Sequence, residues 1–352
     1  MRKERKMKRN LGGWILFLPF LICITYTLWM PTVQGIIWSF FDMQGYTPTG
    51  FAGLKNYRII LKDTGFLRTL LNTLLYVFWS LIIGYWVPFV LAVMLNEVLR
   101  GKSFFRFAMY LPSMAPGIAI SMLWYYMYYP NGSGLLNMLL GWFGIEPQVW
   151  LQNANMTIPL ILISSTWKSM GGTLLLYLAA LQGVNRELYE AALMDGAGIW
   201  KRIRYVMLPE VSGILLLNLV RQIISVFQIM EEPLVMTGGG PNNASMSLGL
   251  LAYRNAFQYF KIGNALAVNV IMFLLLVVLT LFYFKLEKRL TRKIRKGGSC
   301  IEKRKGKQDE YDPGCGNATE KSKNHTDFSD DLLHYRQHGI FSADSVDDGF
   351  FL

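Results

Sequence analysis

Residues 265–284 read ALAVNVIMFLLLVVLTLFYF, a run without a single charged side chain. A helix needs about 20 apolar residues to cross the roughly 30 Å hydrocarbon layer of a membrane. The run passes directly into KLEKRLTRKIRK at residues 285–296, where basic residues predominate. An apolar run of this length that ends in a basic cluster is typical of a transmembrane helix whose end lies in the cytoplasm.

Five more apolar runs of similar length precede this one. The sequence therefore predicts an all-α, polytopic membrane protein with six transmembrane helices. We place them at about residues 11–34, 70–95, 107–129, 158–181, 211–236 and 265–284. The first run is too long for a signal peptide, contains two prolines and has no small-residue cleavage site, so we interpret it as a retained span.

The predicted transmembrane domain covers residues 1–296, and residues 297–352 form a polar tail. Up to Lys296 the chain has 28 basic and 12 acidic residues, whereas the tail has 7 and 11. The tail lacks apolar periodicity, which predicts a disordered cytoplasmic segment. Overall, 53% of residues are hydrophobic and only 16% are charged, against roughly 25% charged in soluble proteins. The basic residues lie in short clusters between apolar runs, which argues against nucleic-acid binding.

The distribution of basic residues predicts the orientation. Twenty Lys and Arg residues flank the spans on one side, and six flank them on the other. Because basic loops stay in the cytoplasm, both termini are predicted to be cytoplasmic. The segment from Pro130 to Met156 contains no basic residue and is predicted to lie outside.

No catalytic or metal-binding constellation is present in the sequence. Cys23 lies in an apolar run, and Cys300 and Cys315 lie in the tail, without zinc-site spacing. There is no Walker A pattern, no H-E-x-x-H and no nucleophile elbow. We therefore predict that the chain is not an enzyme, has no catalytic residues and holds no metal or cofactor.

A predicted cytoplasmic loop between the fourth and fifth spans carries the most informative motif. Asn185 can cap a short helix whose first turn contains Glu187. The pair Asp195–Gly196 is a strong turn signal, and Pro209 can occupy the first turn of the fifth span. The pattern predicts a helix–turn–helix finger. Residue physics alone leaves open whether it docks on a protein or lies on the lipid headgroups.

The finger resembles the EAA motif of permeases from binding-protein-dependent ABC importers, which are bacterial multi-pass proteins of the inner (plasma) membrane. The matching residues are Glu190, Ala191, Ala192, Asp195, Gly196, Ala197, Ile199, Trp200, Leu208 and Pro209. In that family the loop docks on an ATPase subunit, which implies that Glu190 and the Asp195–Gly196 turn lie at that interface. The resemblance implies as partners two ABC ATPase subunits that bind ATP and Mg, a second and non-identical permease subunit, and an extracytoplasmic solute-binding protein.

A second block narrows the class of permease. Gly238, Gly239, Gly240 and Pro241 form a predicted outer glycine loop, and with their neighbours they resemble the maltose and glycerol-3-phosphate branch of carbohydrate permeases. The residues 53–57, Asn72 with Thr73, and 105–112 agree with that branch. The glycines are not a phosphate-binding loop, because no Lys followed by Ser or Thr comes after them. The resemblance covers about residues 10–290 and implies a sugar as substrate.

Polar residues inside the spans are candidates for the transport path, since charges in a membrane usually face a cavity. The candidates from the fourth and fifth spans are Trp167, Lys168, Ser169, Asn218, Arg221, Gln222, Ser225, Gln228, Glu231 and Glu232. In the fifth span they fall on two overlapping helical faces. The Glu231–Glu232 pair differs from the aromatic or aliphatic residues common at this place in the family. An alternative for the charged residues is that they only form ion pairs with one another.

Two alternatives belong to other classes of protein. A secondary carrier could use Lys168, Arg221 and Glu231 as ion or proton relays, but it would have no ATPase for the finger to bind. A membrane-embedded enzyme would need a cluster of catalytic side chains, which the sequence lacks. Pro88, Pro112 and Pro116 are either ordinary kinks or places where helices bend around a transport path.

Overall fold

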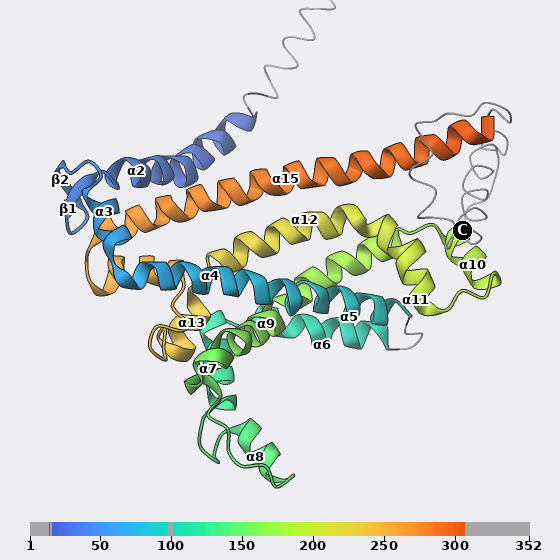
Figure 1. The fold of residues 1–352 in the computed structure, drawn as a ribbon, viewed down its shortest axis with the longest axis horizontal. Helices are drawn as coiled ribbons and strands as arrows, with labels where there is room; N and C mark the ends of the chain where they lie inside the picture. Colours follow the sequence, from blue (N-terminus) through green and yellow to red (C-terminus); the bar gives the residue numbers. More distant parts are fainter. Residues whose placement is uncertain (1–13, 15, 98–100, 307–352) are drawn as a thin grey trace, which may run out of the picture. The chain divides into compact units, whose positions relative to one another are not determined.

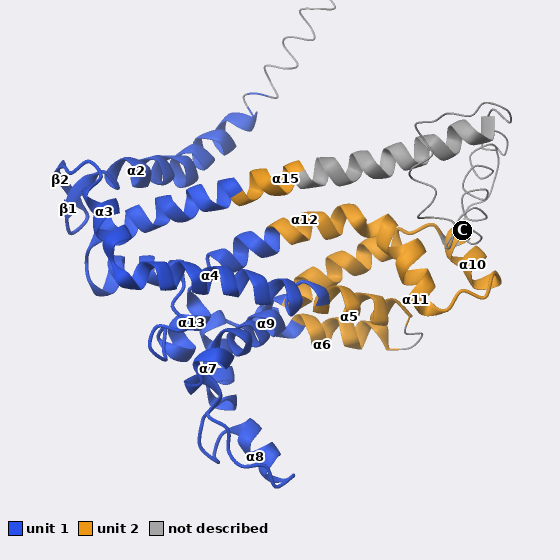
Figure 2. Ribbon diagram, in the orientation of Figure 1, with its two compact units in different colours: residues 1–86, 111–169, 221–278 blue, residues 87–110, 170–220, 279–352 orange. Residues whose placement is uncertain are grey.

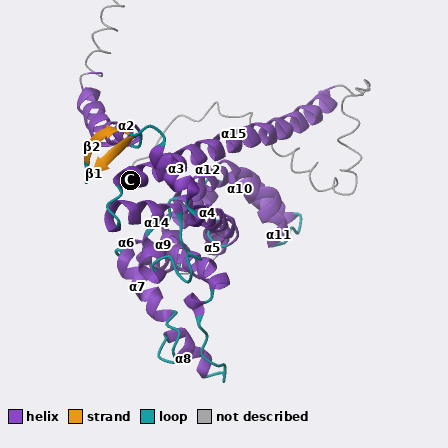
Figure 3. Ribbon diagram, turned by 60° about the vertical axis from the view of Figure 1, so that its left-hand side comes forward, coloured by secondary structure: helices purple, strands orange, loops and turns teal. Residues whose placement is uncertain are grey.

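The computed structural model describes residue 14, residues 16–97 and residues 101–306. Within them the structure is almost entirely helical, with one two-stranded hairpin (Figures 1 and 3). The tail was predicted to be disordered from residue 297, but residues 297–306 are helical and continue α15 (Ile262–Gly306); the rest of the tail lies outside the described residues. The chain divides into two compact units, each assembled from separate stretches of sequence (Figure 2).

Unit 1 comprises residues 1–86, 111–169 and 221–278. Its elements are η1 (Thr25–Trp29), α2 (Met30–Trp38), β1 (Phe41–Gln44), β2 (Thr47–Phe51), α3 (Lys55–Lys62), α4 (Thr64–Ile82), α7 (Gly117–Met127), α8 (Leu135–Gly141), η2 (Trp150–Gln152), α13 (Glu231–Thr237), α14 (Leu248–Tyr253) and η4 (Arg254–Gln258). Its core gathers Tyr76 of α4, Tyr128 directly after α7, Ile161 of the long helix α9 (Ala154–Gln182) and Met236 of α13.

Unit 2 comprises residues 87–110, 170–220 and 279–352. Its elements are α5 (Trp86–Glu97, without its first residue), α6 (Lys102–Met114, without residues 111–114), α10 (Arg186–Met194), α11 (Ile199–Arg202) and η3 (Ile203–Met207). Three long helices contribute to both units: α9 (Ala154–Gln182), α12 (Leu208–Phe227) and α15 (Ile262–Gly306).

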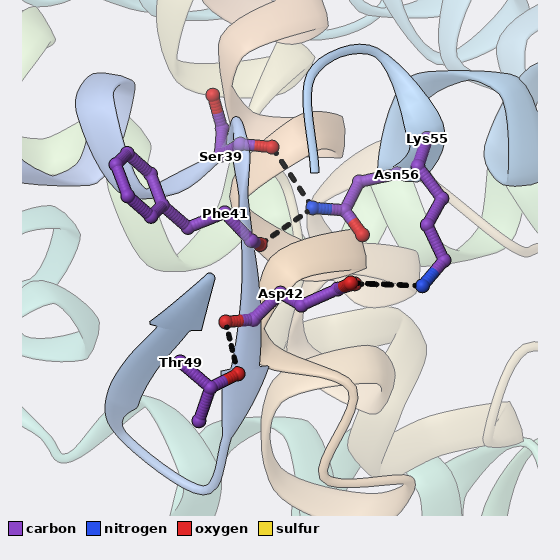
Figure 4. Close-up of polar contacts among 6 residues, drawn as sticks. All are labelled: Ser39, Phe41, Asp42, Thr49, Lys55 and Asn56. Carbon is purple, nitrogen blue, oxygen red and sulfur yellow. Dashed lines mark hydrogen bonds and ion pairs between the residues drawn. The ribbon is translucent and has the colours of Figure 1, made fainter. Parts of the chain in front are cut away.

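The segment after the first helix folds into a hairpin that the sequence analysis did not predict. β1 and β2 pair antiparallel, with a register irregularity between Asp42 and Met43. Asn56 donates from Nδ2 to the carbonyls of Ser39 and Phe41, each at 2.9 Å, and Lys55 pairs with Asp42 at 2.9 Å (Figure 4). The block at residues 53–57 therefore anchors this hairpin to α3.

The first two predicted spans exist with shifted boundaries. The first is helical over Leu16–Trp38 rather than 11–34. The second runs over Thr64–Glu97 rather than 70–95, and a short interruption separates α4 from α5. α4 begins early because Asp63 caps it, accepting a hydrogen bond from the amide of Gly65 at 2.9 Å.

The residues of the third predicted span form two helices with a sharp bend between them, not one straight helix. α6 and α7 meet at an angle of 99°. Pro116 is extended, with φ −56° and ψ 133°, and a proline disfavours helical geometry in the residue before it. Pro116 therefore lies at a sharp bend between two helices. Pro112, in contrast, lies inside α6 without ending it.

The remaining spans differ from the prediction at their ends. The fourth, predicted over 158–181, corresponds to α9, which begins at Ala154 and ends at Gln182. The fifth was predicted to continue to residue 236, but α12 ends at Phe227 and α13 starts at Glu231. The sixth was predicted over 265–284, and α15 extends from Ile262 to Gly306.

Within the described residues, four helices are long and apolar enough to cross a membrane. Counting the bent α6–α7 pair as one span gives five. The chain is thus a helical protein with several membrane-spanning segments. The count of six depends on α9, which has the length of a span but not the required apolar character.

Candidate functional site

The predicted finger is present in unit 2 as α10, a tight turn and α11. Asn185 caps α10, accepting a hydrogen bond at Oδ1 from the amide of Glu187 at 3.0 Å. Glu187 lies in the first turn, where a negative charge is favourable. At the other end of the finger, Pro209 is the second residue of α12, but it does not start a helix, because the helix is continuous over Ile199–Phe227.

The end of α10 explains the spacing of the Asp-Gly-Ala part of the motif. Gly196 has φ +69°, and its amide donates to the Leu193 carbonyl at 3.0 Å. The amide of Ala197 donates to the Ala192 carbonyl at 2.9 Å. These two bonds define a Schellman motif, in which a left-handed residue ends the helix and an apolar contact joins the residues on either side of the turn.

The two alanines that flank this turn supply that apolar contact. Ala192, which is fully buried, and Ala197 pack with Val206 in one small core. The small side chain of Ala192 therefore allows close packing within the finger itself.

The tip of the finger exposes large apolar side chains. Met194 is 88% exposed and Trp200 is 81% exposed. Glu190, Asp195 and Gly196 are also exposed. The finger therefore presents an apolar tip beside acidic groups, held on a rigid turn.

A charged cluster lies inside unit 1. Lys168 of α9 places its Nζ 3.3 Å from Glu231 and 3.3 Å from Glu232, both in the first turn of α13. α13 packs against α7, and Gly117 of α7 adjoins the cluster so closely that an added Cβ would collide with Glu231 and Lys168. Two carboxylates and one ammonium leave the cluster with one excess negative charge.

Aromatic rings accompany this cluster. Trp167 precedes Lys168 in α9 and contacts Trp124 of α7 edge to face, with 5.8 Å between ring centroids. Trp124 in turn contacts Tyr128 at 5.3 Å. These aromatic rings and the charged cluster belong to the same unit.

The second of the two faces predicted for the fifth span is not formed, whereas Asn218, Gln222 and Ser225 of the first all lie within α12. Gln228 and Glu232 lie beyond the end of α12, so the face shared by Arg221, Ser225, Gln228 and Glu232 does not exist. Gln222 lies against Gly84 in unit 1. Arg221, Ser225, Gln228 and Ser169 are exposed, whereas Asn218 belongs to unit 2 and is buried.

The outer glycine loop is fixed by hydrogen bonds to α4. Asn72 donates from Nδ2 to the Asn243 carbonyl at 2.7 Å and the Met246 carbonyl at 3.2 Å. Thr73 accepts from the Leu248 amide at 3.0 Å. These contacts account for Asn72 and Thr73, which the sequence analysis noted only as part of the resemblance.

Within the loop, the carbonyls of the glycines have partners that the sequence analysis missed. Ser245 donates to the Gly240 carbonyl at 2.6 Å, and Arg254 donates to the Gly238 carbonyl. Gly239 and Pro241 lie between and beside these anchored residues. The two partners, Ser245 and Arg254, are ordinary polar residues outside any recognisable motif. Only the folded chain therefore reveals these hydrogen bonds.

The family model described as "Binding-protein-dependent transport system inner membrane component" matches residues 84–292. This stretch contains the finger, the charged cluster and the glycine loop. It begins at the interruption between α4 and α5 and ends within α15.

Relatives and solved structures match over a longer range. The chain is 32% identical to the arabinooligosaccharides transport system permease protein AraP of Halalkalibacterium halodurans, over 76% of this chain and 85% of that protein. It is 31% identical to the trehalose/maltose transport system permease protein MalF of Thermococcus litoralis, over 78% and 92%. A bacterial ABC transporter involved in the import of the acidic polysaccharide alginate matches with a TM-score of 0.71 and 25% identity, over 83% of this chain and all of that chain.

Proposed function

Because the chain belongs to the binding-protein-dependent transport system inner membrane component family of sugar ABC transporter permeases, we propose that it is the permease subunit of an ATP-driven importer of a sugar or oligosaccharide. The observation that carries this proposal is the finger. Its capped helix, Schellman turn and exposed Met194 and Trp200 form a preorganised docking element. A secondary carrier would have no use for such an element.

The proposed partners follow from this role. Two ABC ATPase subunits would hold ATP and Mg and receive the finger. A second, non-identical permease subunit would complete the membrane part. An extracytoplasmic solute-binding protein would deliver the sugar, and in support a related alginate transporter has been solved with an alginate pentasaccharide-bound periplasmic protein.

In the proposed path, the sugar passes the polar and aromatic groups of unit 1. The rings of Trp124 and Trp167 offer apolar surfaces to the C–H faces of a sugar, and Lys168, Glu231 and Gln222 offer hydrogen-bonding groups. The excess negative charge of the cluster favours neutral over anionic sugars, since like charges in a site of low dielectric repel.

The test of the function is reconstitution of the complete complex in liposomes. We expect sugar uptake that requires the solute-binding protein and ATP hydrolysis. Uptake should persist when ionophores collapse the ion gradients. Uptake that is driven by an ion gradient and does not require ATP would support the secondary carrier instead.

The proposed topology has six spans, with α9 as the fourth, in the inner membrane of a bacterium and with both termini in the cytoplasm. We predict that a reporter fused after Met156 lies outside and that one fused after Lys296 lies inside. The reason is the excess of basic residues in the loops on the cytoplasmic side. Paired alkaline phosphatase and fluorescent protein fusions measure this, and phosphatase activity of the fusion after Lys296 would contradict the model.

A further inference from the structure

Three side chains of unit 2 join the finger to the end of α5. The hydroxyl of Tyr189 on α10 donates to the carboxylate of Glu97, the last residue of α5. Arg202 of α11 donates from Nη1 to the Tyr189 hydroxyl at 2.7 Å. Its Nη2 lies 3.5 Å from the second carboxylate oxygen of Glu97. We call these three residues the latch.

The latch is closed on itself and mostly shielded from solvent. The side chain of Arg202 is 13% exposed and that of Glu97 is 24% exposed. The guanidinium also covers the Tyr189 ring, 4.8 Å from its centroid. Burial, followed by the hydrogen bond to Glu97, raises the pKa of Tyr189 to about 12. The hydroxyl therefore keeps its proton at neutral pH and remains a donor to the carboxylate.

The finger does not need the latch to hold its own shape. Asn185 caps its start, Gly196 forms its turn and Ala192 packs in its small core. The latch instead connects both arms of the finger, α10 and α11, to a single carboxylate. The end of α5 is itself fixed, since Lys102 donates to the Asn96 carbonyl at 2.9 Å.

Glu97 is the last residue of the candidate span Thr64–Glu97. A displacement of either arm of the finger would pull or push this helix end through charge-assisted hydrogen bonds, which are stronger and more directional than neutral ones. We infer that Glu97, Tyr189 and Arg202 are positioning residues that transmit movement of the finger to the second span. This inference rests on the proposed function and adds to it the route by which ATP hydrolysis reaches the membrane part.

The test measures coupling in the complete reconstituted transporter. Tyr189→Phe keeps the ring and its contact with the guanidinium but removes the bridging hydroxyl. We expect the ATPase subunits to co-purify and to hydrolyse ATP. The amount of sugar transported for each ATP hydrolysed should fall about tenfold, which is the effect expected from loss of a hydrogen bond to a charged group. Tyr46→Phe removes a hydroxyl from an exposed tyrosine of the hairpin loop and serves as the control.

A conservative variant separates transmission from a merely structural role. Glu97→Gln keeps an acceptor for Tyr189 and should retain more coupling than Glu97→Ala. A ratio of sugar to ATP that is unchanged in Tyr189→Phe and Glu97→Ala would overturn the inference. Loss of ATPase co-purification in these variants would also overturn it, since the latch would then only shape the docking surface. If the unaltered complex imports no sugar, the proposed function fails instead.

Discussion

Gly196→Val is expected to abolish sugar transport while the subunit still inserts into the membrane. Gly196 has φ +69°, a conformation that costs an L-residue about 1–2 kcal/mol and a β-branched residue more. An added Cβ would meet no atom within 4 Å, so the expected defect comes from the backbone alone. The valine would break the Schellman turn and tilt the exposed tip of the finger away from the ATPase subunit proposed to receive it.

Two control variants isolate this cause. Gly198→Val makes the same change two residues away, where φ is −62° and an added Cβ also meets nothing within 4 Å. Gly196→Asn places a residue that tolerates the left-handed region. Both should retain most transport and ATPase co-purification. If Gly198→Val were as defective as Gly196→Val, the size of the side chain and not the turn would be responsible.

Glu190→Lys tests the charge of the same surface. Glu190 is exposed on α10 one turn before the turn residues, so its reversal should not disturb the finger. We expect at least a tenfold loss of ATPase co-purification and of sugar-stimulated hydrolysis, because a reversed charge at a protein interface repels the group that had paired with it. Full stimulation in both Glu190→Lys and Gly196→Val would show that the finger is not the coupling element.

The features that sequence predicted well are those encoded locally. The cap at Asn185 and the turn at Gly196 depend on residues within a few positions of one another. Runs of apolar residues predict where a membrane-spanning helix occurs. The spans predicted at 70–95 and 265–284 coincide with helices of the structure, although those helices are longer than predicted.

The features that sequence missed depend on contacts between distant segments. Glu97 and Tyr189 are 92 residues apart, and no local pattern marks either one. The fifth span ends early at Phe227, and just beyond it the Ile229 carbonyl accepts a hydrogen bond from Ser247 in another segment. The bend at Pro116 was foreseen only as one of two alternatives, since the packing of α7 against α13 cannot be read from the proline itself.

Lys168→Met is expected to destabilise unit 1 and to reduce transport. The change removes the cation that lies 3.3 Å from both Glu231 and Glu232. Removing one partner of a buried ion pair costs on the order of 3–5 kcal/mol. Because Lys168 and Glu231 remain 24% and 36% exposed, we expect a smaller loss of about 2 kcal/mol, visible as a lower thermal unfolding temperature of the purified complex.

A triple variant decides whether the cluster does more than hold α9 to α13. Lys168→Met combined with Glu231→Gln and Glu232→Gln removes every charge together, and such replacements are often neutral for stability. Its unfolding temperature should return close to that of the unaltered protein. Transport should remain low if these charges face the sugar, because the hydrogen-bonding groups of the path have changed. Normal uptake kinetics with normal stability would mean that the three residues only form an ion pair, and the path would then have to be sought among Gln222 and the aromatic residues of α7 and α9.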